Sequence, residues 1–351
     1  MNIKTRIITT SCVIVLLLNN LSMLAQTQNT NLNFGNPTTE EMKMTSCSLE
    51  PNAPAVVLCR LDDVNYEIRD GGFCVVYEIK ERIKILKPEG KDYANVSISY
   101  VDFQGNLMKS EKINGLKAVA FNMADGKIVK TKMDDKLVFR ERLDKEDMLM
   151  KFTIPQVKVG TVIEYQYKIV SPLYYNIRNW YAQTSIPTMY ANYSLVVPEY
   201  FQFSIENTGM HQMQQKESLT GCTFNYNGET LNCNGQEYQF TGHDMPSIKG
   251  DDYVWHAKDY SNKVTAELNS VRIPGVSYQN YSQEWKDIDK SLLDDDDFGH
   301  RMNKSNSLKD EMMAAKIYNM KDNTEKIIAI YQLLKKKLKW NGDYGFWGRS
   351  S

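Results

Sequence analysis

Histidine and cysteine, the residue types best suited to metal binding or nucleophilic chemistry, are few and scattered in this chain. The four histidines are His211, His243, His256 and His300. No two of them stand four residues apart, and none pairs with a cysteine at metal-binding spacing. His243 and His256 could converge with nearby aspartates, but polar residues close to a linker are more often simply solvated. We therefore expect neither a metal site nor a cofactor.

Two cysteines stand symmetrically about Asn227-Gly228, the strongest two-residue hairpin signal in the chain, because both central residues of a type I′ turn need positive φ. This loop places Cys222 opposite Cys233, and it places Phe224 opposite Leu231 on the same apolar face. Directly opposed residues lie close enough for a disulfide. We predict a Cys222–Cys233 bond, with two reduced cysteines packed side by side as the alternative.

The elements that must position such residues read mainly as strands. Residues 73–86 alternate, with Val75, Tyr77, Ile79, Ile83 and Ile85 on one face. After a turn at Gly160, residues 162–169 alternate again, with aromatic and β-branched side chains on one face. Turn signals recur roughly every ten residues with few helical periods between them, which predicts a β-sandwich.

From Ser282 the pattern changes to helical spacing. A helix over 322–338 has an apolar face, a cap at Asp322 or Asn323, and lysines in its last turn. We divide the chain into a signal peptide (1–25), a polar leader (26–49), a β-sandwich domain (50–245), a linker with one strand (246–281) and an α-rich segment (282–351).

The N-terminus and the overall charge indicate an exported protein with no affinity for nucleic acid. Lys4 and Arg6 precede an apolar run, and Ala25 follows at the expected cleavage position, so we predict a secretory signal peptide and a mature chain without a transmembrane anchor. Lys and Arg together number 42 against 43 Asp and Glu, which excludes a basic nucleic-acid-binding protein. We expect a periplasmic or secreted location.

Several segments together resemble a known family. They are AVVL at 55–58, YEIKERIKIL, KDYANVSISY, FTIPQVKVGTVIEYQY and the VVP at 196–198. In order and spacing they are similar to a secreted bacterial domain of unknown function that precedes a transglutaminase-like domain. The part from YVWHAKDYSNKVTAELNSVRIPG to the helix ending LKWNG resembles the linker and first helices of that partner.

The resemblance implies an immunoglobulin-like β-sandwich followed by a short α-rich N-terminal piece of a transglutaminase-like, papain-like α+β domain. That domain uses a Cys-His-Asp triad, whose cysteine lies beyond the Trp-Asn-Gly segment. Here no Cys or His follows Trp340, so no residue can inherit those roles and we expect no catalytic residues.

Two functions remain open at this point. The first is an exported non-catalytic scaffold or binding domain of a transglutaminase-like envelope protein that is truncated before its catalytic part. The alternative is a stand-alone envelope binding module for a protein or glycan partner. The aromatic residues Tyr174, Tyr175, Trp180 and Tyr181 would suit a sugar platform, but such residues more often cap the core of a sandwich.

Overall fold

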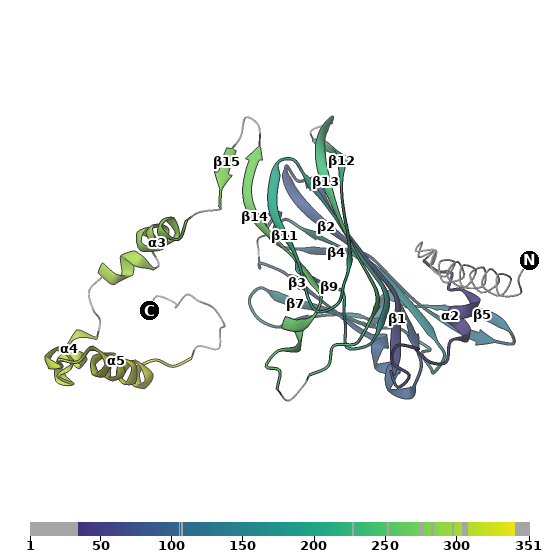
Figure 1. Cartoon of the computed structure of the whole chain (residues 1–351), viewed down its shortest axis with the longest axis horizontal. Helices are drawn as coiled ribbons and strands as arrows, with labels where there is room; N and C mark the ends of the chain where they lie inside the picture. Colours follow the sequence, from purple (N-terminus) through teal and green to yellow (C-terminus); the bar gives the residue numbers. More distant parts are fainter. Residues whose placement is uncertain are drawn as a thin grey trace, which may run out of the picture.

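The computed structural model describes residues 34–340 except 105, 107, 227, 251–252, 274–276, 282–283, 297 and 304–307. The predicted signal peptide, residues 1–25, lies outside the described residues. The fold is mainly β, as the alternating sequence predicts, and its strands form three sheets (Figure 1). The α-helices lie near the two ends of the described chain.

The largest sheet has eight strands in the order β12-β13-β10-β1-β2-β8-β4-β5. Its strands are β1 (Ala55–Arg69), β2 (Gly72–Ile85), β4 (Lys112–Ala124), β5 (Lys127–Lys132), β8 (Val162–Ser171), β10 (Thr188–Pro198), β12 (Gln214–Tyr226) and β13 (Glu229–Met245). Among these described strands, only β1 and β10 pair in parallel. Asp70-Gly71 and Asp125-Gly126, all four with positive φ, make the tight turns of the β1–β2 and β4–β5 hairpins.

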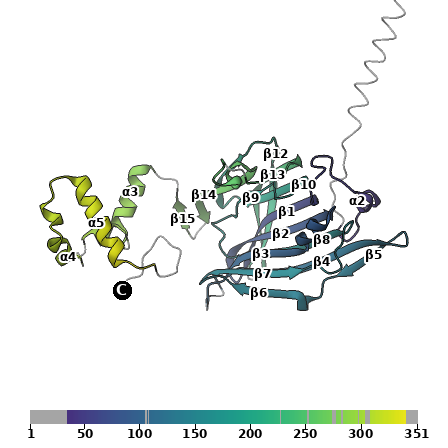
Figure 2. The same cartoon turned by 90° about the horizontal axis from the view of Figure 1, so that it is seen from below.

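Two smaller sheets pack against one face of the large sheet (Figures 1 and 2). One contains β9 (Trp180–Tyr181), β11 (Phe201–Thr208), β14 (Lys263–Ile273) and β15 (Ser277–Asn280). The other contains β3 (Asn95–Val101), β6 (Val138–Arg142) and β7 (Asp147–Thr153), and the 3-10 helix η1 (Pro88–Ala94) leads into it. Buried apolar side chains from all three sheets form one continuous core. We call the face of the large sheet that lines this core its inner face.

The β12–β13 hairpin has the predicted register. Cys222 pairs with Cys233 and Phe224 with Leu231, while Asn227 of the turn lies outside the described residues. The opposite face is polar, since the Thr223 hydroxyl donates to the Asn232 side chain at 3.0 Å. The predicted register is therefore confirmed. Both cysteines are thiols in this structure, and the disulfide stays a prediction.

The segment 26–49, expected as a polar leader, is described from Phe34 onward, and this part packs on the outer face of the large sheet. Its helix α2 (Thr39–Lys43) has a capping box made by Thr38 and Glu41. Met42 and Cys47 are buried against apolar side chains of that outer face. Polar composition therefore did not prevent this segment from docking, because a few apolar side chains and backbone groups make the contact.

Buried charges hold the same segment in place. Arg82 of β2 forms an ion pair with Glu164 of β8, and its Nη1 donates to both carboxylate oxygens of Glu41 at 2.8 Å. Glu164 also accepts from the Gly35 N–H at 2.5 Å. Lys84 Nζ donates to the Met42 carbonyl at 2.6 Å. The alternating sequence places Glu164 on a solvent face, but the docked segment buries it completely.

The remaining helices are 3-10 helices η2 (Asp135–Leu137), η3 (Ala257–Tyr260), η4 (Gly299–Asn303) and η5 (Ile317–Asn319), and α-helices α3 (Trp285–Asp294), α4 (Lys309–Ala314) and α5 (Asn323–Lys337). Figures 1 and 2 show α3, α4 and α5 apart from the sheets. Asp322, one of the two predicted caps, is the N-cap of α5. The apolar face of α5 is largely uncovered, with Ile327 and Tyr331 each 67% exposed. Within the described part of the chain, no helix has the length and apolar character needed to cross a membrane.

Candidate functional site

Three polar side chains lie in a row on the inner face of the large sheet, where most side chains are apolar. Arg60 of β1 is the cross-strand partner of Glu81 of β2, and Glu81 is the partner of Tyr165 of β8. A β-bulge between Val57 and Cys59 turns Arg60 inward, because one extra residue shifts the alternation of side chains by one position. The row is therefore built by strand register.

Arg60 forms an ion pair with Asp62 on its own strand. Its Nε donates to Oδ2 of Asp62 at 2.8 Å, and its Nη2 lies 3.4 Å from Oδ1. The indole N–H of Trp180 also donates to Oδ2 of Asp62, at 2.8 Å. Asp62 thus has a cationic and a neutral donor, and Glu81 is left without an ion-pair partner of its own among the described residues.

Glu81 is the exceptional group of this row. Its side chain is buried, and its Oε2 accepts a hydrogen bond from the Tyr165 hydroxyl at 2.6 Å. Burial raises the pKa of Glu81 above its ordinary value, while the charge of Arg60 and the Tyr165 hydrogen bond act in the opposite direction. No described residue donates a hydrogen bond to the second oxygen, Oε1. With Glu81 ionised, Arg60, Asp62 and Glu81 carry a net charge of −1.

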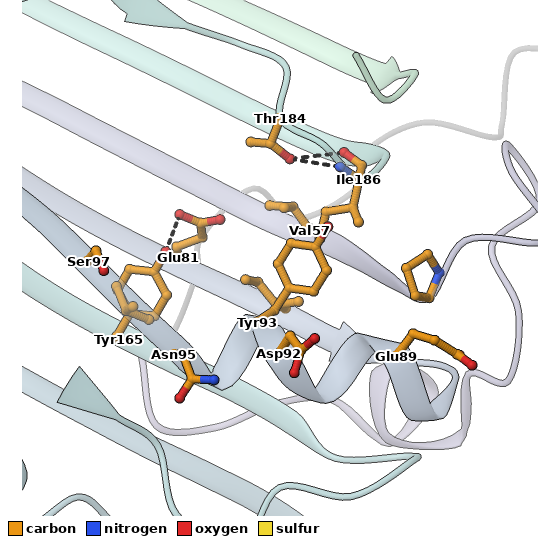
Figure 3. Close-up of a pocket in the computed structure, with 13 residues that line it drawn as sticks. Val57, Glu81, Glu89, Asp92, Tyr93, Asn95, Ser97, Tyr165, Thr184 and Ile186 are labelled. Atoms are coloured by element: carbon orange, nitrogen blue, oxygen red, sulfur yellow. Dashed lines mark hydrogen bonds between the residues drawn. The ribbon is translucent and has the colours of Figure 1, made fainter. Parts of the chain in front are cut away.

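Glu81 and Tyr165 line an open cavity of about 500 Å³ (Figure 3). On one side stand Glu89, Asp92 and Tyr93 of η1, and on the other the segment 184–186. Apolar side chains, including Ile83, complete the walls, and no lysine or arginine is among the described residues that line the cavity. This volume lies within the range of small-ligand sites, roughly 300–1,000 Å³.

One wall of the cavity is the open edge of β3. Among the described strands, β3 pairs only with β7. Its odd-numbered residues direct their backbone groups away from β7, since the Ser99 carbonyl accepts from Arg178 and Val101 exchanges bonds with Glu111. Ser97 lies two residues before Ser99 and lines the cavity, so its backbone faces the same way and offers a peptide-like donor and acceptor there.

Taken together, the arrangement can bind hydrogen-bond donors and positive charge. Its chemically active groups are a buried carboxylate and a tyrosine hydroxyl bonded to it, with two further carboxylates at the mouth. Among the described residues, no group of three His, Cys, Asp or Glu side chains gathers in a way that could hold a metal ion.

The sequence matches the family described as a domain of unknown function with solved structure, DUF3857, over residues 74–249. The chain belongs to this family. The match spans β2 to β13, and thus includes Glu81, Tyr165 and the β3 edge. No curated protein matches the sequence.

Among solved structures, the DUF3857 chain is similar to a crystal structure from Parabacteroides distasonis described as a "putative protease". The TM-score is 0.51 at 15% sequence identity, and the similarity covers 81% of this chain and 50% of that one. At this identity the likeness concerns the fold alone. The chain spans about half the length of that protein.

The residues singled out from the sequence lie elsewhere. Cys222 and Cys233 sit in the β12–β13 hairpin and do not line the cavity. Trp180 is 3% exposed and stacks on Tyr193, so it belongs to the core and is not an open sugar platform. Tyr175, in contrast, is half exposed.

The sequence of the DUF3857 domain contains one feature that marks Glu81 as a candidate site residue. The inner face of β2 is apolar at Val75, Tyr77, Ile79, Ile83 and Ile85, and Glu81 occupies the one missing position of that series. A lone carboxylate in an otherwise apolar, period-two face is costly to bury unless it has partners. Such a gap marks a candidate site. Its partners Arg60 and Tyr165 could not be found in this way, because strand order brings them together.

Proposed function

We propose that this DUF3857 protein is a non-catalytic binding domain of the cell envelope, and that its ligand enters the cavity beside Glu81. The observation that carries the proposal is a buried carboxylate, with one oxygen that accepts from no described residue, at an open cavity of ligand size. The predicted signal peptide supports export to the periplasm or beyond.

Within this proposal the domain serves as a scaffold or recognition part of a larger enzyme-like protein. Three observations support it. The sequence resembles immunoglobulin-like sandwich domains that precede a transglutaminase-like domain. The similar solved structure is longer, since the match covers 81% of this chain and only 50% of that one, and it is described as a "putative protease". The apolar faces of α3 and α5 are exposed, as expected for the first helices of a domain whose core lies elsewhere.

A stand-alone envelope binding module is the second candidate, and the position of the cavity favours it. Every residue that lines the cavity lies between Pro54 and Ile186, within the β sheets and their connections. Binding there requires nothing from α3, α4 or α5. The two candidates thus share one site and differ only in what the site serves.

The test is ligand-observed NMR of the full chain against two fragment sets, short peptides and short oligosaccharides of the envelope. Ser97→Trp places a large side chain at the cavity wall, and Ser204→Trp, at an exposed position of β11, is the matched control. We expect at least one fragment to bind the wild type and the control but not Ser97→Trp. A complete absence of fragments with that behaviour would refute the cavity as the binding site.

A further inference from the structure

The charge around the cavity beside Glu81 is unbalanced. Arg60, the nearest cation on the inner face, donates to Asp62 through two nitrogens, so the buried group as a whole stays negative when Glu81 is ionised. At the mouth, Glu89 and Asp92 are exposed and form no ion pair with any described residue. A ligand that enters the cavity meets three carboxylates and no cation among the described lining residues.

The second oxygen of Glu81 is available to accept from a ligand in the cavity. The Glu81 side chain is only 8% exposed, and nothing described donates to its Oε1. This oxygen keeps contact with solvent, because Thr188 Oγ1 is the one fully buried side-chain polar atom without a partner in the described part of the chain. A charged donor from a ligand would be its strongest hydrogen-bond partner. Figure 3 shows the Tyr165 hydroxyl on one oxygen only, with the other directed away from it.

Two contacts bound the opening along the chain. Arg178 Nη1 donates to the Ser99 carbonyl at 3.1 Å on one side of Ser97, and the Tyr93 hydroxyl lies 2.9 Å from Ser185 Oγ on the other. The first contact joins β3 to the segment 178–186, and the second joins η1, just before β3, to the same segment. A side chain can enter between them, with its own backbone beside the Ser97 edge.

The walls suit a long aliphatic stem. Val57, Ile83 and Ile186 line the cavity together with Glu81. Lysine and arginine bury their methylene groups on apolar surface while the charged end seeks a polar partner. A neutral oligosaccharide would bury polar hydroxyls on these walls and would leave the negative charge unbalanced, so the observations favour a basic side chain.

We propose that the cavity accepts a lysine or arginine side chain of a partner polypeptide, with Glu81 Oε1 as its counter-ion. The aliphatic stem packs on the apolar walls, the partner's backbone bonds to Ser97, and Glu89 and Asp92 attract the charge to the mouth. This inference rests on the binding function proposed above and specifies its ligand.

The test uses the full chain, labelled with ¹⁵N, and titrates it with acetyl-Gly-Lys-Gly-amide. Acetyl-Gly-norleucine-Gly-amide, which keeps the stem without the charge, and chitotriose are titrated separately. We expect the lysine peptide to shift the backbone amides of Tyr93, Ser97 and Ile186 and to bind at least about tenfold more tightly than the norleucine peptide. That ratio follows from the value of a charge-assisted hydrogen bond.

Glu81→Gln keeps the shape of the side chain and should abolish the preference for lysine. Its matched control is Glu78→Gln, on the same strand but on the outer face, where Glu78 pairs with Lys168. Asp92→Asn, at an exposed position, should lower the affinity two- to threefold.

The outcomes separate this inference from the binding function itself. Equal affinity for the lysine and norleucine peptides, or a preference that survives in Glu81→Gln, would overturn the cationic ligand and leave the binding function intact. Shifts of the same amides by chitotriose alone would replace the basic peptide by a glycan. Unmoved cavity amides with all three probes would remove both proposals.

Discussion

Replacement of Arg82 by methionine tests whether the docked N-terminal segment turns an ordinary cross-strand ion pair into a structural requirement. Arg82 pairs with Glu164 across β2 and β8, and Glu78 pairs with Lys168 on the same face of the same two strands. The side chains of the first pair are 4% and 0% exposed, whereas those of the second are 32% and 47% exposed. The two ion pairs therefore differ mainly in their exposure to solvent.

The expected magnitudes follow from that difference. Without Arg82, Glu164 keeps the Gly35 N–H as a donor but loses its cation, and Glu41 loses a bidentate partner. Removal of one partner from a buried ion pair costs about 3–5 kcal/mol, because a charge remains buried without compensation. Removal of one partner from an exposed pair costs about 0–1 kcal/mol. We thus expect Arg82→Met to lose far more stability than Lys168→Met.

The assay is urea unfolding of the full chain at pH 7, with the midpoint and slope compared between variants. Arg82→Met combined with Glu164→Leu should recover much of the loss, since no uncompensated carboxylate then remains on β8. In Arg82→Met alone, stability should increase as the pH falls from 7 towards 5. Burial raises the pKa of Glu164, so the folded state takes up a proton there before the unfolded state does. Equal losses in Arg82→Met and Lys168→Met would refute the reasoning.

Four further predictions concern other parts of the chain. Burial lowers the pKa of Lys84 from 10.5 to about 8, so the unfolded state binds more protons than the folded state between these pH values. The free energy of unfolding should therefore rise from pH 8 towards pH 10.5, by up to about 3 kcal/mol. The same pH dependence of stability in Lys84→Met would contradict this. Mass mapping of the non-reduced, periplasmically expressed protein should show a Cys222–Cys233 bond, worth roughly 2–3 kcal/mol at most, and free thiols at both positions would exclude it. Amide exchange should be faster in 284–340 than in 73–170, because the apolar faces of α3 and α5 are exposed, and equal strong protection would show that these helices are covered. The purified chain should show no thiol-dependent transamidase or peptidase activity, and activity lost on replacement of any one mature cysteine by serine would reverse that expectation.

Local sequence patterns were sufficient for the individual strands and turns. The alternation in 73–86 predicted β2 within one residue at either end, and Asn227-Gly228 predicted the complete pairing of β12 with β13. The candidate caps Asp322 and Asn323 predicted the start of α5 to within one residue. Each of these features depends on residues close together in the chain, where turn geometry and side-chain alternation leave few choices.

What only the tertiary structure decided is which strands become neighbours and which faces are covered. Arg60, Glu81 and Tyr165 form a row because β1, β2 and β8 are adjacent in the sheet, and a bulge decides that Arg60 points inward. The sequence around Glu164 is that of a solvent-facing position, yet residues from Gly35 to Met42 bury it. Partners so distant in the chain are chosen by the total burial of apolar and charged groups, which no local pattern records.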